Sequence, residues 1–141
     1  MQKEEVQHVK NFALNLRKKI LKMAFEAGSS SSHLGGALSI VEIIATLFSN
    51  KMNLDKNNLN SEDRDRFILS KGHACLAYYA ALSEIGLIDN DELNTFEKDE
   101  SNLLGHPILN KKLGIDFSTG SLGMGLSIAI GLAISSKKKK K

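Results

Sequence analysis

The sequence has very little cysteine, no secretory signal and no long apolar run, and each absence excludes a class of protein. Cys75 is the single cysteine among 141 residues, so no disulfide can form within the chain. The first ten residues, MQKEEVQHVK, are charged and lack the apolar core of a signal peptide. Because free thiols fit a reducing compartment, we expect a cytoplasmic protein. The longest apolar candidate, 122–134, is interrupted by glycines and Ser127 and is shorter than the ~20 residues that span a membrane, so we predict no membrane partner.

The chain also lacks a basic surface outside its last five residues. The formal net charge is +3, and it becomes −2 when the five positive charges of Lys137 to Lys141 are subtracted. A basic patch is the usual footprint of nucleic-acid binding, so we predict no nucleic-acid partner. The length and the ordinary apolar fraction, 42%, fit one folded domain. We therefore divide the chain into a domain part, 1–136, and a lysine tail, 137–141.

Two helices are predicted in the first half of the sequence. Apolar residues that step by three and four indicate an amphipathic helix over 4–27, which ends at Gly28. A loop over 29–39 follows, because it contains four serines, one histidine and two glycines. Ser39-Ile-Val-Glu42 has the form of a capping box and predicts a second helix over 39–49. This helix is apolar nearly all round, so we expect it to be buried.

The middle of the chain predicts an α/β arrangement. After a polar connection over 50–66, Arg66 to Ser70 has the pattern of a short buried strand. It runs into Lys71-Gly72-His73-Ala74 and a helix that continues to about Ile85. A strand, a glycine turn and a helix in this order gather ligand groups where the strand ends. A second capping box, Asp89 to Glu92, opens a short helix to about Phe96.

The most informative stretch is Gly114 to Ser136, in which Gly120, Gly123 and Gly125 precede a run of small apolar residues. A loop that opens into a helix presents unpaired N–H groups, and glycines let a ligand approach them. The spacing is neither the GxGxxG of dinucleotide sites nor the GxxxxGK[ST] of P-loops, which disfavours both. A turn before a buried helix, with no ligand, is the alternative that this stretch alone leaves open.

Three histidines lie in predicted loops, each next to a glycine or one residue away from it: His33, His73 and His106. Their spacing does not match a zinc site and Cys75 has no second thiol beside it, so we predict no metal ligands in this chain. The GxSxG elbow of serine hydrolases is also missing. Histidines on separate loops suit hydrogen bonding around a hydroxylated or phosphorylated ligand, although a purely structural role stays open for each.

Four segments together resemble one known family. They are SSHLGGALSIVEIIATLF (31–48), DRDRFILSKGHACLAYYAALSEIGLI (63–88), GHP (105–107) and DFSTGSLGMGLSIAIGLA (116–133). In order and spacing they resemble the N-terminal, thiamine-diphosphate-binding part of transketolase, from about residue 12 onward. The short GSLG loop is most similar to the small split transketolases, in which two chains share the work. The resemblance implies an α/β fold: an incomplete thiamine-diphosphate-binding fold, helix-rich with a short parallel sheet.

The resemblance also implies roles for individual residues. His33 would contact the ketose substrate, His73 the cofactor diphosphate and the substrate, and His106 the substrate hydroxyls. The loop residues Gly120, Ser121, Leu122 and Gly123 would hold the cofactor rings. The sequence departs from the family pattern at Ser32, Leu34 and Met124, where glycine, proline and glutamine are usual.

The resemblance further implies Mg²⁺, held in the family by a Gly-Asp-Gly segment and a later asparagine. Neither is present in these 141 residues, nor is the pyrimidine-domain glutamate that activates the cofactor. We therefore expect a chain that is inactive alone and acts on sugar phosphates with a C-terminal transketolase chain or a missing remainder, in a homo- or hetero-oligomer. The alternatives are a non-catalytic assembly subunit or a deoxyxylulose phosphate synthase-like fragment, although the SKGHA and GHP segments look more like transketolase.

Overall fold

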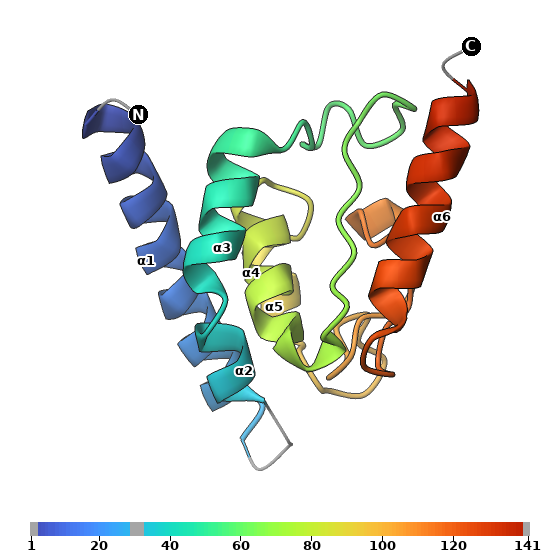
Figure 1. Cartoon of the computed structure of the whole chain (residues 1–141). Helices are drawn as coiled ribbons and strands as arrows, with labels where there is room; N and C mark the ends of the chain where they lie inside the picture. Colours follow the sequence, from blue (N-terminus) through green and yellow to red (C-terminus); the bar gives the residue numbers. More distant parts are fainter. Residues whose placement is uncertain (1–2, 29–32, 140–141) are drawn as a thin grey trace.

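The computed structural model describes residues 3–28 and 33–139, and these residues are helix-rich (Figure 1). The α-helices are α1 (Lys3–Glu26), α2 (Leu34–Leu38), α3 (Val41–Thr46), α4 (Cys75–Glu84), α5 (Asn90–Leu93) and α6 (Met124–Lys139). A π-helical turn, η1 (Leu47–Lys51), extends α3, and two 3₁₀ turns are η2 (Gly72–Ala74) and η3 (Lys111–Leu113). Ser32 and the last two lysines of the predicted tail lie outside the described residues.

The predicted amphipathic helix is confirmed as α1. Its buried residues are Ala13, Leu16, Ile20 and Met23, which step by three and four along one face. This face packs against α3 and α4. Gly28 follows with φ +62°, a left-handed conformation that glycine adopts without the steric cost of a side chain. The fourth histidine of the chain, His8, is exposed on this helix.

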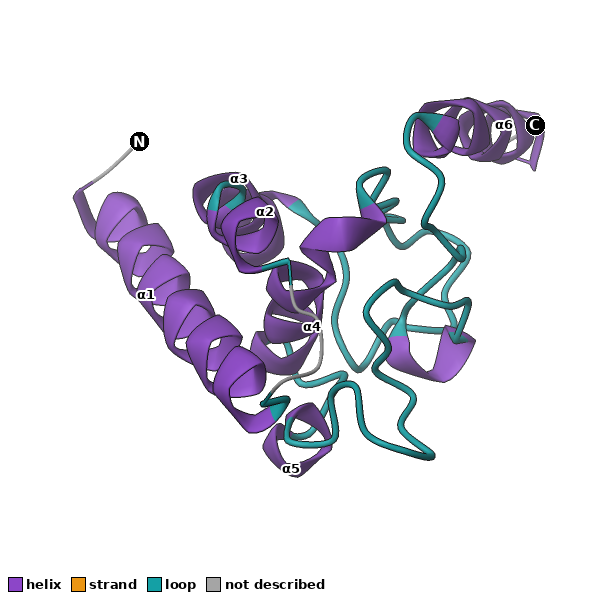
Figure 2. Cartoon of the chain, turned by 90° about the horizontal axis from the view of Figure 1, so that it is seen from below, coloured by secondary structure: helices purple, strands orange, loops and turns teal. Residues whose placement is uncertain are grey.

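Helix α4 lies at the centre of the fold. Every residue from Cys75 to Ser83 is buried, and α1, α2, α3 and α5 all contact this helix. Figure 2 shows α4 between these helices and the loop region, with α6 set apart at the edge. Because His73 immediately precedes α4, its backbone is attached to the most deeply buried element of the protein.

The predicted parallel sheet is not confirmed. Residues 66–70 are extended, but they pair with no neighbouring strand, and across 3–28 and 33–139 the only β pairing is an isolated antiparallel bridge between Asn110 and Ile115. A strand needs backbone hydrogen bonds to a second strand, and within the described part of the chain residues 66–70 make none. Its apolar side chains still pack: Leu69 is buried, and the Phe67 ring lies 5.1 Å from the rings of both Phe48 and Tyr78.

The first predicted capping box is wrong. Residues 34–38 form α2 instead of a loop, and the Ser39 hydroxyl donates to the Gly36 carbonyl at 2.9 Å, so it does not accept from the next helix. Helix α3 begins only at Val41, and Glu42 pairs with Arg17 of α1. Ile43 is 62% exposed, so the second predicted helix is buried on one side only. The second box correctly places a short helix after Asp89, but the Asp89 side chain makes no capping bond.

Helix α6 confirms a helix after the glycine-rich stretch but is mostly uncovered. Gly125 is its one buried residue within the described range, where a Cβ would lie 2.5 Å from Ser70 Cα. The large apolar side chains that follow, Leu126, Ile130 and Ile134, are each more than half exposed. None of the described helices combines the length and the apolar character that crossing a membrane requires.

Candidate functional site

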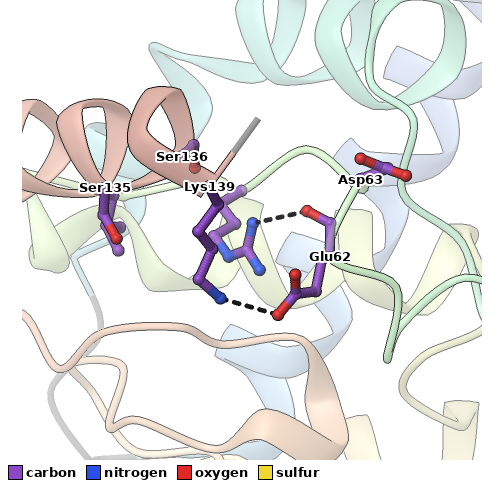
Figure 3. Close-up of a pocket in the computed structure, with 7 residues that line it drawn as sticks. Glu62, Asp63, Ser135, Ser136 and Lys139 are labelled. Atoms are coloured by element: carbon purple, nitrogen blue, oxygen red, sulfur yellow. Dashed lines mark hydrogen bonds and ion pairs between the residues drawn. The ribbon is translucent and has the colours of Figure 1, made fainter. Parts of the chain in front are cut away.

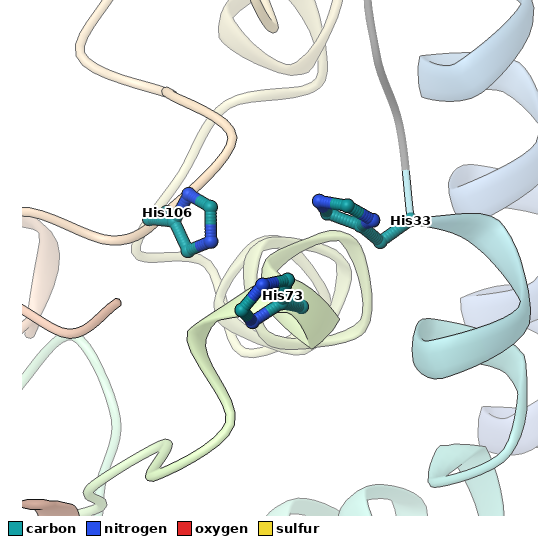
Figure 4. Close-up of side chains that lie close together, drawn as sticks. All are labelled: His33, His73 and His106. Carbon is teal, nitrogen blue, oxygen red and sulfur yellow. The ribbon is translucent and has the colours of Figure 1, made fainter. Parts of the chain in front are cut away.

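The three predicted histidines converge from three separate segments. His33 directly precedes α2, His73 lies in η2 before α4, and His106 lies in the Gly105–Pro107 loop. The ring centroids are 4.7 Å apart for His33 and His73, 4.5 Å for His73 and His106, and 6.0 Å for His33 and His106. Figure 4 shows the three rings around a shared space. The fold therefore assembles one site from residues that are more than 30 positions apart in sequence.

His73 is the central member of this cluster, and one of its ring nitrogens has no partner. Its Nδ1 is buried and makes no hydrogen bond among the described residues. A buried imidazole nitrogen is nearly always paired in native proteins, so we expect a ligand group or an ordered water to pair with this atom. Burial lowers the pKa of His73 first, and nearby His106, His33 and Lys71 lower it further. The ring is therefore neutral at pH 7 and offers both a donor and an acceptor.

Two side chains of α4 hold the loop that carries His106. The Cys75 thiol donates to the Gly105 carbonyl at 3.1 Å, and the Tyr79 hydroxyl donates to the Leu104 carbonyl at 2.8 Å. Burial raises the pKa of Cys75 to about 12 and also raises the pKa of Tyr79, so both groups stay protonated as donors. These two positioning residues were missed in the sequence, although their spacing of four places them on one face of the helix.

The glycine-rich loop contacts the same turn through Thr119 and Gly120. A Cβ at Gly72 would lie 2.8 Å from Thr119 Oγ1 and 3.1 Å from Gly120 N, so only glycine permits this approach. The Thr119 N–H donates to the Pro107 carbonyl at 2.9 Å, which joins the loop to the His106 segment. Thr119 Oγ1 is buried without a hydrogen-bond partner among the described residues, like His73 Nδ1. Two unpartnered polar atoms therefore lie at the junction of these loops.

The predicted loop residues divide into two groups. Gly120 lies beside His106, where a Cβ would be 3.9 Å from His106 Cδ2. Ser121 shares with Gly120 the lining of a hollow of about 290 Å³. Leu122 and Gly123 are exposed, and Gly123 has φ +86° at the turn into α6. In this structure Leu122 and Gly123 do not join the histidine cluster, and their predicted role as cofactor contacts stays a prediction.

A buried ion pair anchors the start of the glycine-rich loop. Arg64 makes two hydrogen bonds to the Asp116 carboxylate, at 2.9 and 2.6 Å, and a third at 2.7 Å to the Leu59 carbonyl. Both side chains are almost fully buried. Two parallel bonds fix the direction of the carboxylate as well as its distance. The pair therefore holds the backbone three residues before Thr119, a role that the sequence analysis missed.

An open hollow of about 460 Å³ lies in front of the cluster. Its lining includes His33, His106, Thr119, Glu97 and Gly105. This volume falls within the range of small-molecule sites, about 300–1,000 Å³. The lining offers imidazole, hydroxyl and backbone groups, which suit a ligand rich in hydroxyl or phosphate oxygens.

A second hollow, shown in Figure 3, is about 220 Å³ and lies between residues 62–66 and the last turns of α6. Lys139 Nζ forms an ion pair with Glu62 Oε1 at 2.8 Å, and both side chains are mainly exposed. No predicted site residue lines this hollow, and none of its described lining residues has a buried, unpartnered side-chain atom. The histidine cluster is therefore the candidate site.

Comparison with known families decides the relationship. The family model described as "Transketolase, thiamine diphosphate binding domain" matches residues 11–141, nearly the whole chain. The chain belongs to the transketolase family. This confirms the resemblance seen in the four sequence segments.

Individual transketolases agree with this assignment. The chain is 41% identical over 123 residues to one of the subunits of apulose-4-phosphate transketolase from Actinobacillus succinogenes, covering 87% of this chain and 44% of that protein. It is 37% identical over 134 residues to human transketolase, covering 95% of this chain and 21% of that protein. The fold matches transketolase from Leishmania mexicana with a TM-score of 0.79 and 30% identity, over 89% of this chain and 19% of the other. The chain thus spans less than half the length of these relatives.

Proposed function

We propose that this chain provides thiamine diphosphate and sugar-phosphate contacts for two-carbon ketol transfer, together with a C-terminal transketolase chain. The observation that carries the proposal is the pair of buried, unpartnered atoms, His73 Nδ1 and Thr119 Oγ1, beside three converging histidines. Two relatives are named as individual subunits of an apulose-4-phosphate transketolase, which supports a two-chain assembly. We expect this chain to be inactive without its partner.

The residues present fit the cofactor that the family domain binds. Gly72 leaves room for the Thr119–Gly120 backbone to approach the N-terminus of α4, and both unpartnered atoms lie at that junction. We assign His73, Gly120 and Ser121 to the cofactor, with Leu122 and Gly123 as the adjoining contacts of the same loop. Thiamine diphosphate, when bound, supplies the electron sink for carbon–carbon bond cleavage. The Mg²⁺ that the resemblance implies would take its protein ligands from the partner or from residues outside this sequence.

The remaining two histidines are assigned to the sugar phosphate. His33 and His106 line the open hollow, where their ring nitrogens can bind hydroxyl groups. An imidazole can also accept and return a proton at a substrate hydroxyl. Because α4 holds the His106 loop through Cys75 and Tyr79, the position of that loop is fixed before the substrate arrives.

The test is to assemble this protein with the C-terminal transketolase subunit from the same organism and to measure the rate of ketol transfer. We expect His33→Ala, His73→Ala and His106→Ala each to lower kcat/KM by about 100-fold or more, the range of general acid–base groups. His8→Ala is the matched control, because His8 is exposed on α1, and it should retain full activity. Parent-level activity in all three cluster variants would contradict the proposal.

A second candidate function is a non-catalytic assembly subunit. The exposed apolar side chains of α6, Leu126, Ile130 and Ile134, favour it, because a partner surface could cover them. The same reconstitution separates the two functions. Co-elution with the C-terminal chain, without any ketol transfer or thiamine diphosphate binding, would favour the assembly role.

A further inference from the structure

The geometry points to a transition-metal site formed by His33, His73 and His106, one that binds a Zn²⁺-like ion when thiamine diphosphate and sugar phosphate are absent. Each histidine offers one ring nitrogen, and the three nitrogens lie within 4.8 Å of one another. The inference rests on this geometry and not on the proposed function. The proposed ion also differs from the Mg²⁺ that the resemblance implies. Mg²⁺ prefers oxygen ligands, whereas imidazole suits zinc, copper and nickel.

The distances are close to those that a bound ion needs. Zinc–nitrogen bonds of about 2.0–2.1 Å in a tetrahedral site place the nitrogens about 3.3–3.4 Å apart. The separation of up to 4.8 Å therefore has to shrink by about 1.5 Å. His33 is exposed at the start of α2, so its ring is free to turn toward His73 and His106. Figure 4 shows the three rings arranged around the space in which the ion would lie.

The surroundings of the cluster favour a cation with imidazole ligands. The His73 Nδ1 atom is buried and has no hydrogen-bond partner among the described residues, so one nitrogen of the central ring is left unsatisfied in this cluster. Lys71, whose charge acts on His73, donates to the Gly36 carbonyl at 3.2 Å. The Glu97 carboxylate lines the same hollow as His33 and His106 and adds negative charge there.

The sequence spacing argued against a metal because the three histidines are 40 and 33 positions apart. That argument applies to sites built within one short segment, whereas this cluster is assembled by the fold. Three protein ligands leave a fourth position open, as in catalytic zinc sites. On the proposed function these imidazoles also bind cofactor and sugar phosphate, so an ion held there would compete with both ligands and inhibit the enzyme.

The test is a Co²⁺ titration of the protein carrying this chain, stripped of metal and prepared without thiamine diphosphate. We expect one ion per chain and the visible absorption of four- or five-coordinate Co²⁺, with Zn²⁺ displacing it. Each of His33→Ala, His73→Ala and His106→Ala should weaken binding by about tenfold or more, since even outer residues of metal sites cost that much. His8→Ala should leave both affinity and spectrum unchanged.

The inference is overturned if no visible band appears, or if His73→Ala binds Co²⁺ as tightly as the parent protein does. It is equally overturned if His8→Ala weakens binding as much as the cluster variants. Circular dichroism checks that each variant is folded, and glutamine replaces alanine at any position where the alanine variant is not. If Co²⁺ does not bind but thiamine diphosphate does, the metal site is refuted and the proposed function stands. If Co²⁺ binds but ketol transfer is absent, the metal site stands and the proposed function fails.

Discussion

Helices α4 and α6 are built from similar residues and have opposite surroundings. Both are rich in alanine, leucine and other small or apolar residues, and both follow a turn that contains glycine. Every residue of α4 from Cys75 to Ser83 is buried, whereas α6 buries only Gly125 within the described range. An apolar helix is therefore recognisable from its residues, but its burial depends on which elements are present to cover it.

The difference between the two helices also divides the candidate site. His73 is attached to α4, which four other helices contact, and α4 in turn fixes the His106 loop. The glycine-rich loop leads into α6 and depends on a few upstream contacts, chiefly the Arg64–Asp116 pair and the approach of Thr119 to Gly72. The half of the site next to α4 should therefore be rigid, and the half next to α6 should be easier to displace.

The largest expected effect comes from breaking the buried ion pair. Arg64→Met leaves the Asp116 carboxylate buried without its partner, which costs about 3–5 kcal/mol of unfolding free energy. We expect the amides of 116–125 to lose hydrogen-exchange protection while those of α4 keep it, because α4 is buried against four other helices. Urea unfolding and hydrogen exchange measure the two effects.

The control for this variant is the exposed pair at the far end of α6. Glu62→Gln removes the partner of Lys139, and both side chains are mainly exposed, so we expect no measurable change in stability. The double variant Arg64→Met/Asp116→Leu should recover part of the loss, since no unpaired charge stays buried. Equal losses from Arg64→Met and Glu62→Gln would refute the idea that the buried pair anchors the loop.

The next largest effect is the difference in stability lost when a leucine is replaced by alanine in α4 and in α6. Leu76→Ala opens a cavity in the fully buried α4 and should cost about 2–5 kcal/mol of unfolding free energy. Leu126→Ala in α6, where the side chain is 68% exposed, should change it by no more than about 0.5 kcal/mol. Chemical denaturation of the parent and of both variants tests this. If the two substitutions cost the same, α6 is covered in solution and the contrast between the helices is wrong.

The sequence predicted the helices well and the tertiary pairing poorly. The 3.6-residue pattern gave α1 with its ends, and the helix predicted to continue to about Ile85 ends at Glu84. The extended segment 66–70 has the right residues for a strand, but a sheet depends on a second backbone that local pattern does not reveal. Ser39 does not cap the following helix because its hydroxyl donates to the Gly36 carbonyl instead. A serine can make either of these local hydrogen bonds, and the sequence alone does not decide between them.

For the site, the sequence singled out three histidines that the fold brings together, but not the groups that hold them. His33, His73 and His106 stood out because each lies in a loop near a glycine, and the fold brings all three together. Cys75, Tyr79 and Arg64 act through neighbours distant in sequence, and no short motif shows such long-range hydrogen bonds.

The smallest effect separates two glycines of α6. A Cβ at Gly125 would lie 2.5 Å from Ser70 Cα, a backbone atom, so Gly125→Ala must push the helix away from residue 70 and should cost about 1–3 kcal/mol of unfolding free energy. Gly131 has nothing within 4 Å of the added Cβ, so Gly131→Ala should stabilise the helix by about 0.5–1 kcal/mol through its higher helix propensity. The two substitutions are chemically identical and lie six residues apart, so opposite signs in thermal unfolding can come only from the packing of Gly125 on Ser70. If both variants are stabilised, α6 does not pack on the 66–70 segment, and the contacts of Arg64, Asp116 and Thr119 hold the glycine-rich loop without that packing.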